Sequence, residues 1–369
     1  MDELKKYILV INPGSTSTKI ALFNEVGFNV LSKTLCHHRT EIDAFDKIYD
    51  QKDMRVRVIM EWMNEVGVEL EEIKAVVARG GLLRPMPGGT YNITKKLLED
   101  LKLGYQGQHA SNLGGIIAKD IADKTNIRAY IVDPVAVDEL SEVARLSGLP
   151  EIPRNSLVHA LNVRAVARRV SYKLEKDFNE ASYIVAHIGG GISIVAMESG
   201  KMIDVSNGYE GGPMSPERCG EVPVGALLNM CFSEEFQKDE LIKKIQRSSG
   251  ILGYIGINDG RVIEEKITKG DKNVELIFTA MAYQISKEIA AMATVLKGRV
   301  DAIILTGGLV HNKRLVDYIK ESVGFISPIE LVPGEDEMLA LYEGAKRVME
   351  GEEEAKIYEE EVFFYDKEF

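Results

Sequence analysis

The chain has 369 residues, of which 45% are hydrophobic and 28% are charged, and this length and balance predict a globular protein of about two domains. Its 45 Lys and Arg residues against 57 Asp and Glu residues give a net charge of −12, which argues against nucleic-acid binding, because nucleic-acid backbones are held by dense basic patches. The N-terminal residues are charged where a signal peptide needs an apolar core, and no stretch reaches the ~18 consecutive apolar residues of a membrane span. We therefore expect a cytoplasmic protein without nucleic-acid or membrane partners.

Strand-like and helix-like segments alternate along the first half of the chain. Apolar runs rich in β-formers predict strands, and apolar residues at helical spacing predict helices. The expected strands are 7–12, 20–23, 73–78 and 129–132, and the expected helices are 54–66 and 113–123. Two prolines three residues apart disfavour regular structure at 150–153, which is therefore the predicted domain boundary.

The second half repeats this alternation. The predicted segments are a strand–turn–strand unit at 183–197, a helix at 277–296, a strand at 302–305, a helix at 315–319 and a strand at 329–332. The acidic segment 350–361, followed by apolar residues 362–365, predicts a helix that docks through its aromatic end. Alternating strands and helices predict an α/β protein in which helices cover the sheets.

The strand–turn–strand unit at 183–197 is similar to the one at 7–23. When the two are aligned without gaps, identical residues coincide at four pairs of positions: Tyr7 with Tyr183, Ile8 with Ile184, Gly14 with Gly190 and Ser17 with Ser193. The chain is therefore expected to contain a weak internal repeat, with one copy in each half.

The first turn, 12–19, gathers small hydroxyl residues, a glycine and a lysine. Backbone N–H groups and hydroxyls in such a turn can bind a phosphate, and the lysine neutralises its charge. The candidate residues are Asn12, Ser15, Ser17 and Lys19. The alternative is an ordinary hairpin turn with Ser and Thr for solubility. A P-loop is excluded, because the second glycine before Lys19 is missing and isoleucine follows the lysine.

Two further turns are rich in glycine. Gly189, Gly190 and Gly191 lie between two β-like runs, where they would let a backbone approach a ligand that any Cβ would block; the alternative is a β-bulge. The third segment contains Gly307, Gly308 and Asn312. It follows a buried-type strand and precedes a helix, which suits a nucleoside bound at the end of a sheet.

The order of these three turns resembles that of the actin, sugar kinase and heat-shock chaperone superfamily. Within it, the run 10–19 and six positions of the second turn resemble the acetate and butyrate kinase (acetokinase) family: His187, Gly189, Gly191, Ser193, Ala196 and Gly200. Further agreement covers nearly the whole chain, at 79–81, 107–109, 132–133, 218–220 and 335–337. Gly190 in the middle of the second turn and Glu221, directly after the segment 218–220, are similar to the butyrate branch rather than the acetate branch.

The resemblance implies two duplicated ribonuclease-H-like (actin-like ATPase) domains, each a mixed sheet flanked by helices, with the active site in the cleft between them. The predicted domains are 1–153, to which a C-terminal helix at about 338–369 returns, and 154–337, which binds the nucleotide.

The resemblance also assigns roles to charged residues. Arg79 and Arg218 would bind the acid and brace the transferring phosphoryl group, since a planar guanidinium bonds two oxygens at once; the alternative is a surface ion pair. Asp133 would orient an arginine or the hydration shell of a metal, and its alternative is an N-cap before Val135.

Mg²⁺ would be held with Asn12 and one of two late acids, Asp336 or Glu337, between which the sequence does not decide. Both acids could instead cap a helix that starts near Met338.

Three histidines are candidates by the same resemblance. His109 would line the acid pocket, and His159 and His187 would act near the transferring phosphoryl group. The alternative for each is a hydrogen-bonded structural histidine.

The resemblance implies that the enzyme phosphorylates butyrate or a short branched acid with ATP, by direct in-line transfer. The products would be ADP and an acyl phosphate, which is butanoyl phosphate when the acid is butyrate, and the reaction would be reversible. The resemblance also implies Mg as a cofactor and a homo-oligomer. A carboxylate is already a nucleophile at neutral pH, so no general base is obligatory. The alternatives are an acetate or propionate kinase of the same family and, from another class, an actin-like nucleotide-switched binding protein. The expectation depends on convergence of Arg79 and Arg218 beside the terminal phosphate.

Overall fold

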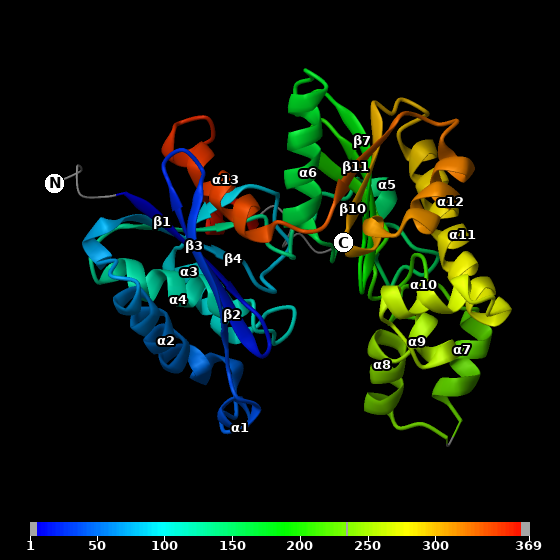
Figure 1. The fold of residues 1–369 in the computed structure, drawn as a ribbon, viewed down its shortest axis with the longest axis horizontal. Helices are drawn as coiled ribbons and strands as arrows, with labels where there is room; N and C mark the ends of the chain where they lie inside the picture. Colours follow the sequence, from blue (N-terminus) through cyan, green and yellow to red (C-terminus); the bar gives the residue numbers. More distant parts are fainter. Residues whose placement is uncertain (1–5, 234, 363–369) are drawn as a thin grey trace. The chain divides into compact units, whose positions relative to one another are not determined.

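The computed structural model describes residues 6–233 and 235–362, and the chain divides into two compact units (Figure 1). Unit 1 consists of Met1–Asp138 and Asp336–Phe369, and unit 2 consists of Glu139–Glu335. The sequence predicted a first domain of 1–153 with 338–369 and a second domain of 154–337. That prediction would place residues 139–153 in the first domain, whereas they lie in unit 2. Because the Ser141 N–H donates to the Ile203 carbonyl (2.9 Å), we propose that the boundary lies after Asp138.

Unit 1 contains a seven-stranded mixed sheet with the order β12-β5-β6-β4-β1-β2-β3. The strands are β1 (Tyr7–Pro13), β2 (Ser17–Asn24), β3 (Asn29–Cys36), β4 (Ile73–Arg79), β5 (Thr90–Asn92), β6 (Arg128–Val132) and β12 (Lys356–Ile357). β1, β2 and β3 form an antiparallel meander, whereas β4 pairs parallel to β1 and β6 pairs parallel to β4. The carboxyl ends of β1, β4 and β6 therefore meet at one edge of the sheet.

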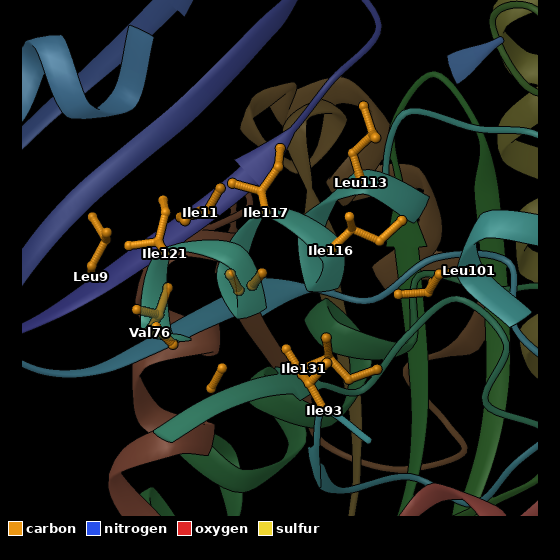
Figure 2. Close-up of a cluster of buried hydrophobic side chains, with 14 of the residues drawn as sticks. Leu9, Ile11, Val76, Ile93, Leu101, Leu113, Ile116, Ile117, Ile121 and Ile131 are labelled. Carbon is orange, nitrogen blue, oxygen red and sulfur yellow. The ribbon is translucent and has the colours of Figure 1, made fainter. Parts of the chain in front are cut away.

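Helices cover both faces of this sheet. On one face, α4 (Asn112–Asp123) packs against β1, β4 and β6, with α2 (Lys52–Glu65) and α3 (Lys95–Leu103) against α4. Leu9 and Ile11, two residues apart and so on one face of β1, meet Ile117 and Ile121 there (Figure 2). On the other face lies α13 (Glu337–Met349), where a Cβ on Gly344 would be 2.4 Å from a methyl group of Val132. A four-residue α1 (Arg39–Ile42) and the one-turn η2 (Ile48–Gln51) and η3 (Leu70–Glu72) complete the helices before β4.

Unit 2 contains a five-stranded mixed sheet with the order β11-β10-β7-β8-β9. The strands are β7 (Ser182–Ile188), β8 (Ile192–Glu198), β9 (Lys201–Val205), β10 (Ala302–Gly307) and β11 (Ile329–Pro333). β7, β8 and β9 are antiparallel neighbours, and β10 pairs parallel to β7 and to β11. This repeats the order and directions of β3-β2-β1-β4-β6, so the internal repeat expected from the hairpins extends to five strands in each unit.

Helices also flank the second sheet. α6 (Ala160–Lys173) packs on one face, where Ser171 and Tyr183 share a hydrogen bond (2.9 Å). α11 (Lys272–Val295) packs on the other face, with α12 (Lys313–Val323) against it. The remaining helices of unit 2 are α5 (Glu142–Arg145), α7 (Val224–Cys231), α8 (Lys238–Arg247), α9 (Gly250–Ile255), α10 (Gly260–Thr268) and the one-turn η4 (Gly308–His311). In the described residues, no helix is both long and apolar enough to cross a membrane.

The prediction for the end of the chain is wrong in part. The expected helix over 350–361 is absent up to 357: a turn follows α13, β12 pairs with β5, and only α14 (Tyr358–Val362) is helical. The clustered acidic side chains of this segment repel one another. Before Ile357 the segment also has no apolar face whose burial would stabilise a helix. Docking through the aromatic residues 363–365 lies outside the described residues; Tyr358 and Val362 are buried in the core of unit 1.

Tyr358 gives a testable link between this tail and stability. Its buried hydroxyl donates to Asp100 Oδ2 (3.0 Å) and accepts from the Arg84 N–H (3.1 Å). Burial opposes ionisation of Asp100, but hydrogen bonds from Lys96, Arg84 and Tyr358 outweigh it and lower the pKa of that carboxyl. Because the folded pKa is lowered, the ionised cluster stabilises the fold above the unfolded pKa of about 4. That stability is lost as pH falls through the folded pKa.

We expect Tyr358→Phe to lower the free energy of unfolding at neutral pH by about 1–3 kcal/mol, because it leaves buried partners unsatisfied. Urea denaturation should show a smaller difference below the folded pKa of Asp100, where the carboxyl is protonated in both proteins. Tyr172→Phe is the matched control, since Tyr172 is exposed, and its effect should stay within about 0.5 kcal/mol. An equal loss in both variants would contradict this account of the tail.

Candidate active site

The first turn of unit 1 connects β1 to β2 as a tight hairpin. The Gly14 N–H donates to the Ser17 carbonyl (2.7 Å). Ser15 and Lys19 are exposed and Ser17 is half-buried, whereas Asn12 is only 6% exposed at the end of β1. The hydroxyls and the lysine ammonium therefore lie at the surface of the turn, where a phosphate could reach them.

Three side chains from distant parts of unit 1 meet beside this turn. Asn12 Nδ2 donates to Glu337 Oε2 (2.6 Å), and Arg79 Nη1 donates to Glu337 Oε1 (2.6 Å). Asn12 and Arg79 lie at the carboxyl ends of the parallel strands β1 and β4, and Glu337 is the first residue of α13. Ligands of open α/β sheets bind outside the carboxyl ends of parallel strands, so this cluster occupies the expected place for a ligand.

The two late acids have different surroundings. Asp336 Oδ1 accepts from the Leu339 N–H (3.1 Å) and so caps α13, which begins at Glu337 rather than at Met338. Glu337 is in the first turn, but its carboxylate turns to Asn12 and Arg79. Of the two candidates for the metal, Glu337 is the one that the fold brings to Asn12.

Asp133 follows the carboxyl end of β6, whose Val132 pairs with Arg79. Its Oδ1 accepts from the Gly89 N–H (2.7 Å), and its backbone is in the left-handed region, with φ of 37°. Residues 135–136 form a turn, and no helix begins directly after Asp133. The alternative reading as a helix N-cap is therefore wrong, and a buried carboxylate in a strained backbone at this edge favours a functional role.

His109 lies in the loop between α3 and α4, exposed to solvent. The Ser111 N–H donates to its Nδ1 (3.2 Å), and the Ser111 hydroxyl lies 2.9 Å from the same atom. Since Nδ1 accepts, the neutral ring carries its proton on Nε2.

The glycine turn of unit 2 joins β7 to β8. The pairing of these strands is regular from Ser182 to Ile188, so the alternative of a β-bulge is wrong. A Cβ on Gly191 would lie 2.6 Å from Arg218 Nη1, whereas a Cβ on Gly190 would meet nothing closer than 3.9 Å. A Cβ on Gly191 would therefore displace the Arg218 guanidinium, which packs against the turn.

Arg218 is held in this place by two further groups. Its guanidinium lies over the Tyr209 ring, 4.1 Å from the centroid, and Nη1 donates to the Gly208 carbonyl (3.3 Å). The Ser215 hydroxyl donates to the Gly190 carbonyl (2.7 Å), which ties the loop that carries Arg218 to the turn. None of these partners is a carboxylate, so the alternative of a surface ion pair does not describe Arg218.

The imidazoles of His159 and His187 stack beside the glycine turn, with centroids 3.9 Å apart and planes 13° apart. His159 Nδ1 lies 3.0 Å from the Ser193 hydroxyl. His187 is buried; its Nδ1 donates to Asn162 Oδ1 (2.9 Å), and its Nε2 lies 3.1 Å from Glu335 Oε1. The fold thus brings together two histidines that the sequence separates by 28 positions.

The third segment lies at the carboxyl end of β10, which is parallel to β7. Gly307 has φ of 95°, and a Cβ there would be 2.4 Å from the Ile188 carbonyl oxygen, so only glycine allows this approach. A Cβ on Gly308 would have open space around it. Asn312 Oδ1 accepts from the Leu315 N–H (2.9 Å) and Nδ2 donates to Glu264 (3.0 Å), which makes it the N-cap of α12.

Several residues of these clusters were not predicted from the sequence. They are Asn162, Tyr209, Glu335 and Arg55, whose guanidinium donates to the Gly14 carbonyl of the first turn. Only Arg55 left a usable signal: it shares the buried face of the predicted helix with Ile59 and Trp62, at spacings of four and seven residues, and a charged residue on such a face needs a partner.

Comparison with known proteins shows the family and the fold of the chain. The sequence profile of the Acetokinase family matches residues 154–326. Butyrate kinase 2 of Clostridium acetobutylicum is 49% identical over 356 residues, 96% of this chain and 100% of the relative, and Butyrate kinase 1 of the same organism is 49% identical over 352 residues, 95% and 99% of the two chains. The crystal structure of Porphyromonas gingivalis acetate kinase superposes with a TM-score of 0.77 at 22% identity, covering 93% of this chain and 100% of that one.

Proposed function

Because the chain belongs to the acetokinase family, we propose that it uses ATP to phosphorylate butyrate or a short branched carboxylic acid, giving an acyl phosphate and ADP. The observation that supports this most is the 49% identity to two butyrate kinases over nearly their whole length. The reaction is reversible, so the enzyme would also return ATP from the acyl phosphate.

The two arginines would solve the main electrostatic problem of this reaction, which brings an anionic acid to an anionic phosphate. Arg79 is oriented by Glu337, and Arg218 by Tyr209 and the glycine turn. Guanidinium groups fixed in this way can hold carboxylate and phosphoryl oxygens without reorganising during the transfer. Because the acid is ionised at neutral pH, positioning and charge stabilisation supply the rate and no residue needs to remove a proton.

Glu337, in the first turn of α13, and Asn12 would fit a magnesium ion. Mg²⁺ keeps several waters and takes only one or two protein carboxylates, and Glu337 with Asn12 offers such a donor set. Among the described residues no group of three or more His, Cys, Asp and Glu side chains is arranged for a metal. When bound, the ion would neutralise charge on the phosphates; Glu337 and Asn12 would hold it, and Asp133 would orient its water shell or Arg79.

The stacked histidines would act on the phosphoryl group. The hydrogen bond to Asn162 orients the ring of His187, and that ring fixes the plane of His159 by stacking. We assign His159 to charge stabilisation on the transferring group, His187 to holding it in place, and His109 to the acid pocket.

The chain length of the acid tests the proposed substrate against acetate and propionate. We expect kcat/KM to be at least about tenfold higher for butyrate than for acetate, since each methylene in an apolar pocket contributes ~1–3 kcal/mol of discrimination. Rates of ADP formation with acids of two to five carbons measure this. A preference for acetate would show that the chain is an acetate kinase, and a propionate optimum would show a propionate kinase.

A hydroxamate trap for the acyl phosphate tests the class of activity. A nucleotide-switched binding protein would hydrolyse ATP slowly without acid and form no hydroxamate, whereas a carboxylate kinase forms hydroxamate in proportion to ADP. Sedimentation at several concentrations would test the expected homo-oligomer.

A further inference from the structure

Arg55, in the first turn of α2, is fully buried, with 0% of its surface exposed. Its Nη1 donates to the carbonyls of Gly14 (2.9 Å) and Ser17 (3.1 Å) and to Thr18 Oγ1 (3.0 Å), and its Nη2 donates to the Ser15 carbonyl (3.3 Å). One side chain on a helix thus binds four residues of the first hairpin turn. The turn cannot change shape without breaking several of these bonds.

The remaining partner of Arg55 is the amide of Gln51. Gln51 Oε1 accepts from Nη2 (2.9 Å) and from Nε (3.3 Å). All of these partners are neutral, and in the described part of the chain no carboxylate lies within ion-pair distance of Arg55. Burial lowers the pKa of Arg55 to about 10, so the group still carries its charge at neutral pH. Burying an unpaired charge is costly, and a neutral side chain would fill the same space at less cost.

The carbonyls that face Arg55 also determine where the N–H groups of the turn point. In a trans peptide the C=O and the following N–H point in opposite directions. Since the carbonyls of Gly14 and Ser15 turn inward to the guanidinium, the N–H groups of Ser15 and Thr16 turn outward. Both of these residues are exposed. Successive outward N–H groups form an anion-binding surface, and a cation behind the carbonyls polarises the same peptide groups further.

We propose that Arg55 is a positioning residue for phosphate binding: it fixes the first hairpin with its N–H groups outward and supplies an uncompensated positive charge behind them. The inference rests on the proposed function in taking the terminal phosphates of a nucleoside triphosphate as the ligand of this turn. Arg55 itself does not touch the ligand.

Gln51→Glu separates this role from a structural one. The substitution keeps the size of the side chain and the acceptor oxygen that binds Arg55, but it adds a negative charge that neutralises the guanidinium. The melting temperature should stay the same or rise, whereas KM for ATP should increase about five- to tenfold, with KM for butyrate within about twofold. A nucleotide KM equal to that of the wild type, in a protein of unchanged melting temperature, would overturn the inference.

Arg55→Met tests the geometry as well as the charge. Amide hydrogen exchange in a peptide spanning 12–20 should increase, and KM for ATP should rise at least about twentyfold. Arg57→Met is the matched control on the same helix, because Arg57 is exposed and pairs with Glu41 and Glu61; neither exchange in 12–20 nor KM should change. If the Arg55→Met variant does not fold, the KM of the Gln51→Glu variant for ATP tests the inference by itself.

Direct binding separates this inference from the proposed function. Calorimetric titration with a non-hydrolysable ATP analogue, without any acid, gives a dissociation constant for each variant. Wild-type protein that binds the analogue but forms no acyl phosphate would refute the proposed function and leave the comparison of variants valid. Equal dissociation constants for the wild type and Gln51→Glu would refute the role of Arg55, whatever acid the enzyme uses.

Discussion

Alanine at Arg218 or at Arg79 is expected to lower kcat/KM for butyrate at least about 10³-fold, the scale on which arginines stabilise phosphoryl transfer. The two side chains belong to different units and touch different partners, Tyr209 and Glu337 respectively. A large loss in both variants would therefore mean that one reaction needs both. Hydroxamate formation and ADP release should fall together, while the ATP analogue still binds.

Arg261→Ala is the control for these two variants. Arg261 is exposed and pairs only with the neighbouring Asp259 among the described residues, so its removal should leave kcat/KM within about twofold. Arg218→Lys adds a test of geometry: a lysine keeps the charge but loses the planar fork, and most of the activity should still be lost. Activity within about tenfold of the wild type in either alanine variant would refute the assignment of that arginine.

Alanine at Gly191 is expected to reduce kcat/KM about a hundredfold or more with little loss of stability, because misplacing a catalytic group by about 1 Å can cost this much. The new Cβ would lie 2.6 Å from Arg218 Nη1, and the guanidinium, as the end of a flexible side chain, would move. Gly191 does not have a positive φ, so the backbone tolerates alanine. Thermal unfolding should separate this loss of activity from misfolding.

Gly190→Ala is the matched control, one residue away in the same turn. A Cβ there would lie 3.9 Å from the nearest atom, in Glu217, so the position of Arg218 should not change. Because Gly190 is itself a candidate nucleotide-binding residue, any loss of activity should be smaller than in Gly191→Ala and should come from KM for ATP. If Gly190→Ala reduced activity as much as Gly191→Ala, the cause would be the turn itself and not the displacement of Arg218.

Periodicity predicted the elements that have one buried face. The helix expected at 113–123 is α4 at Asn112–Asp123, and the strand expected at 73–78 is β4 at Ile73–Arg79. Each packs one apolar face against a sheet or a helix layer. Apolar residues then recur at the period of the helix or strand, and this periodicity predicts the element. No helix or strand was expected from the sequence between 224 and 268, where the structure has the four helices α7, α8, α9 and α10. The first of these helices, α7, buries none of its residues, so no one-sided pattern marks it.

The sequence by itself determined the family resemblance, the two glycine- or serine-rich hairpins and the types of residue at the candidate site, because these depend on short runs of neighbouring residues. It left open which late acid accompanies Asn12, and it did not reveal Arg55 behind the first turn. Tertiary structure decided both: α13 brings Glu337 to β1 across 325 positions, and α2 brings Arg55 to Gly14 across 41. Such pairings follow from how helices pack on a sheet, which local periodicity does not encode.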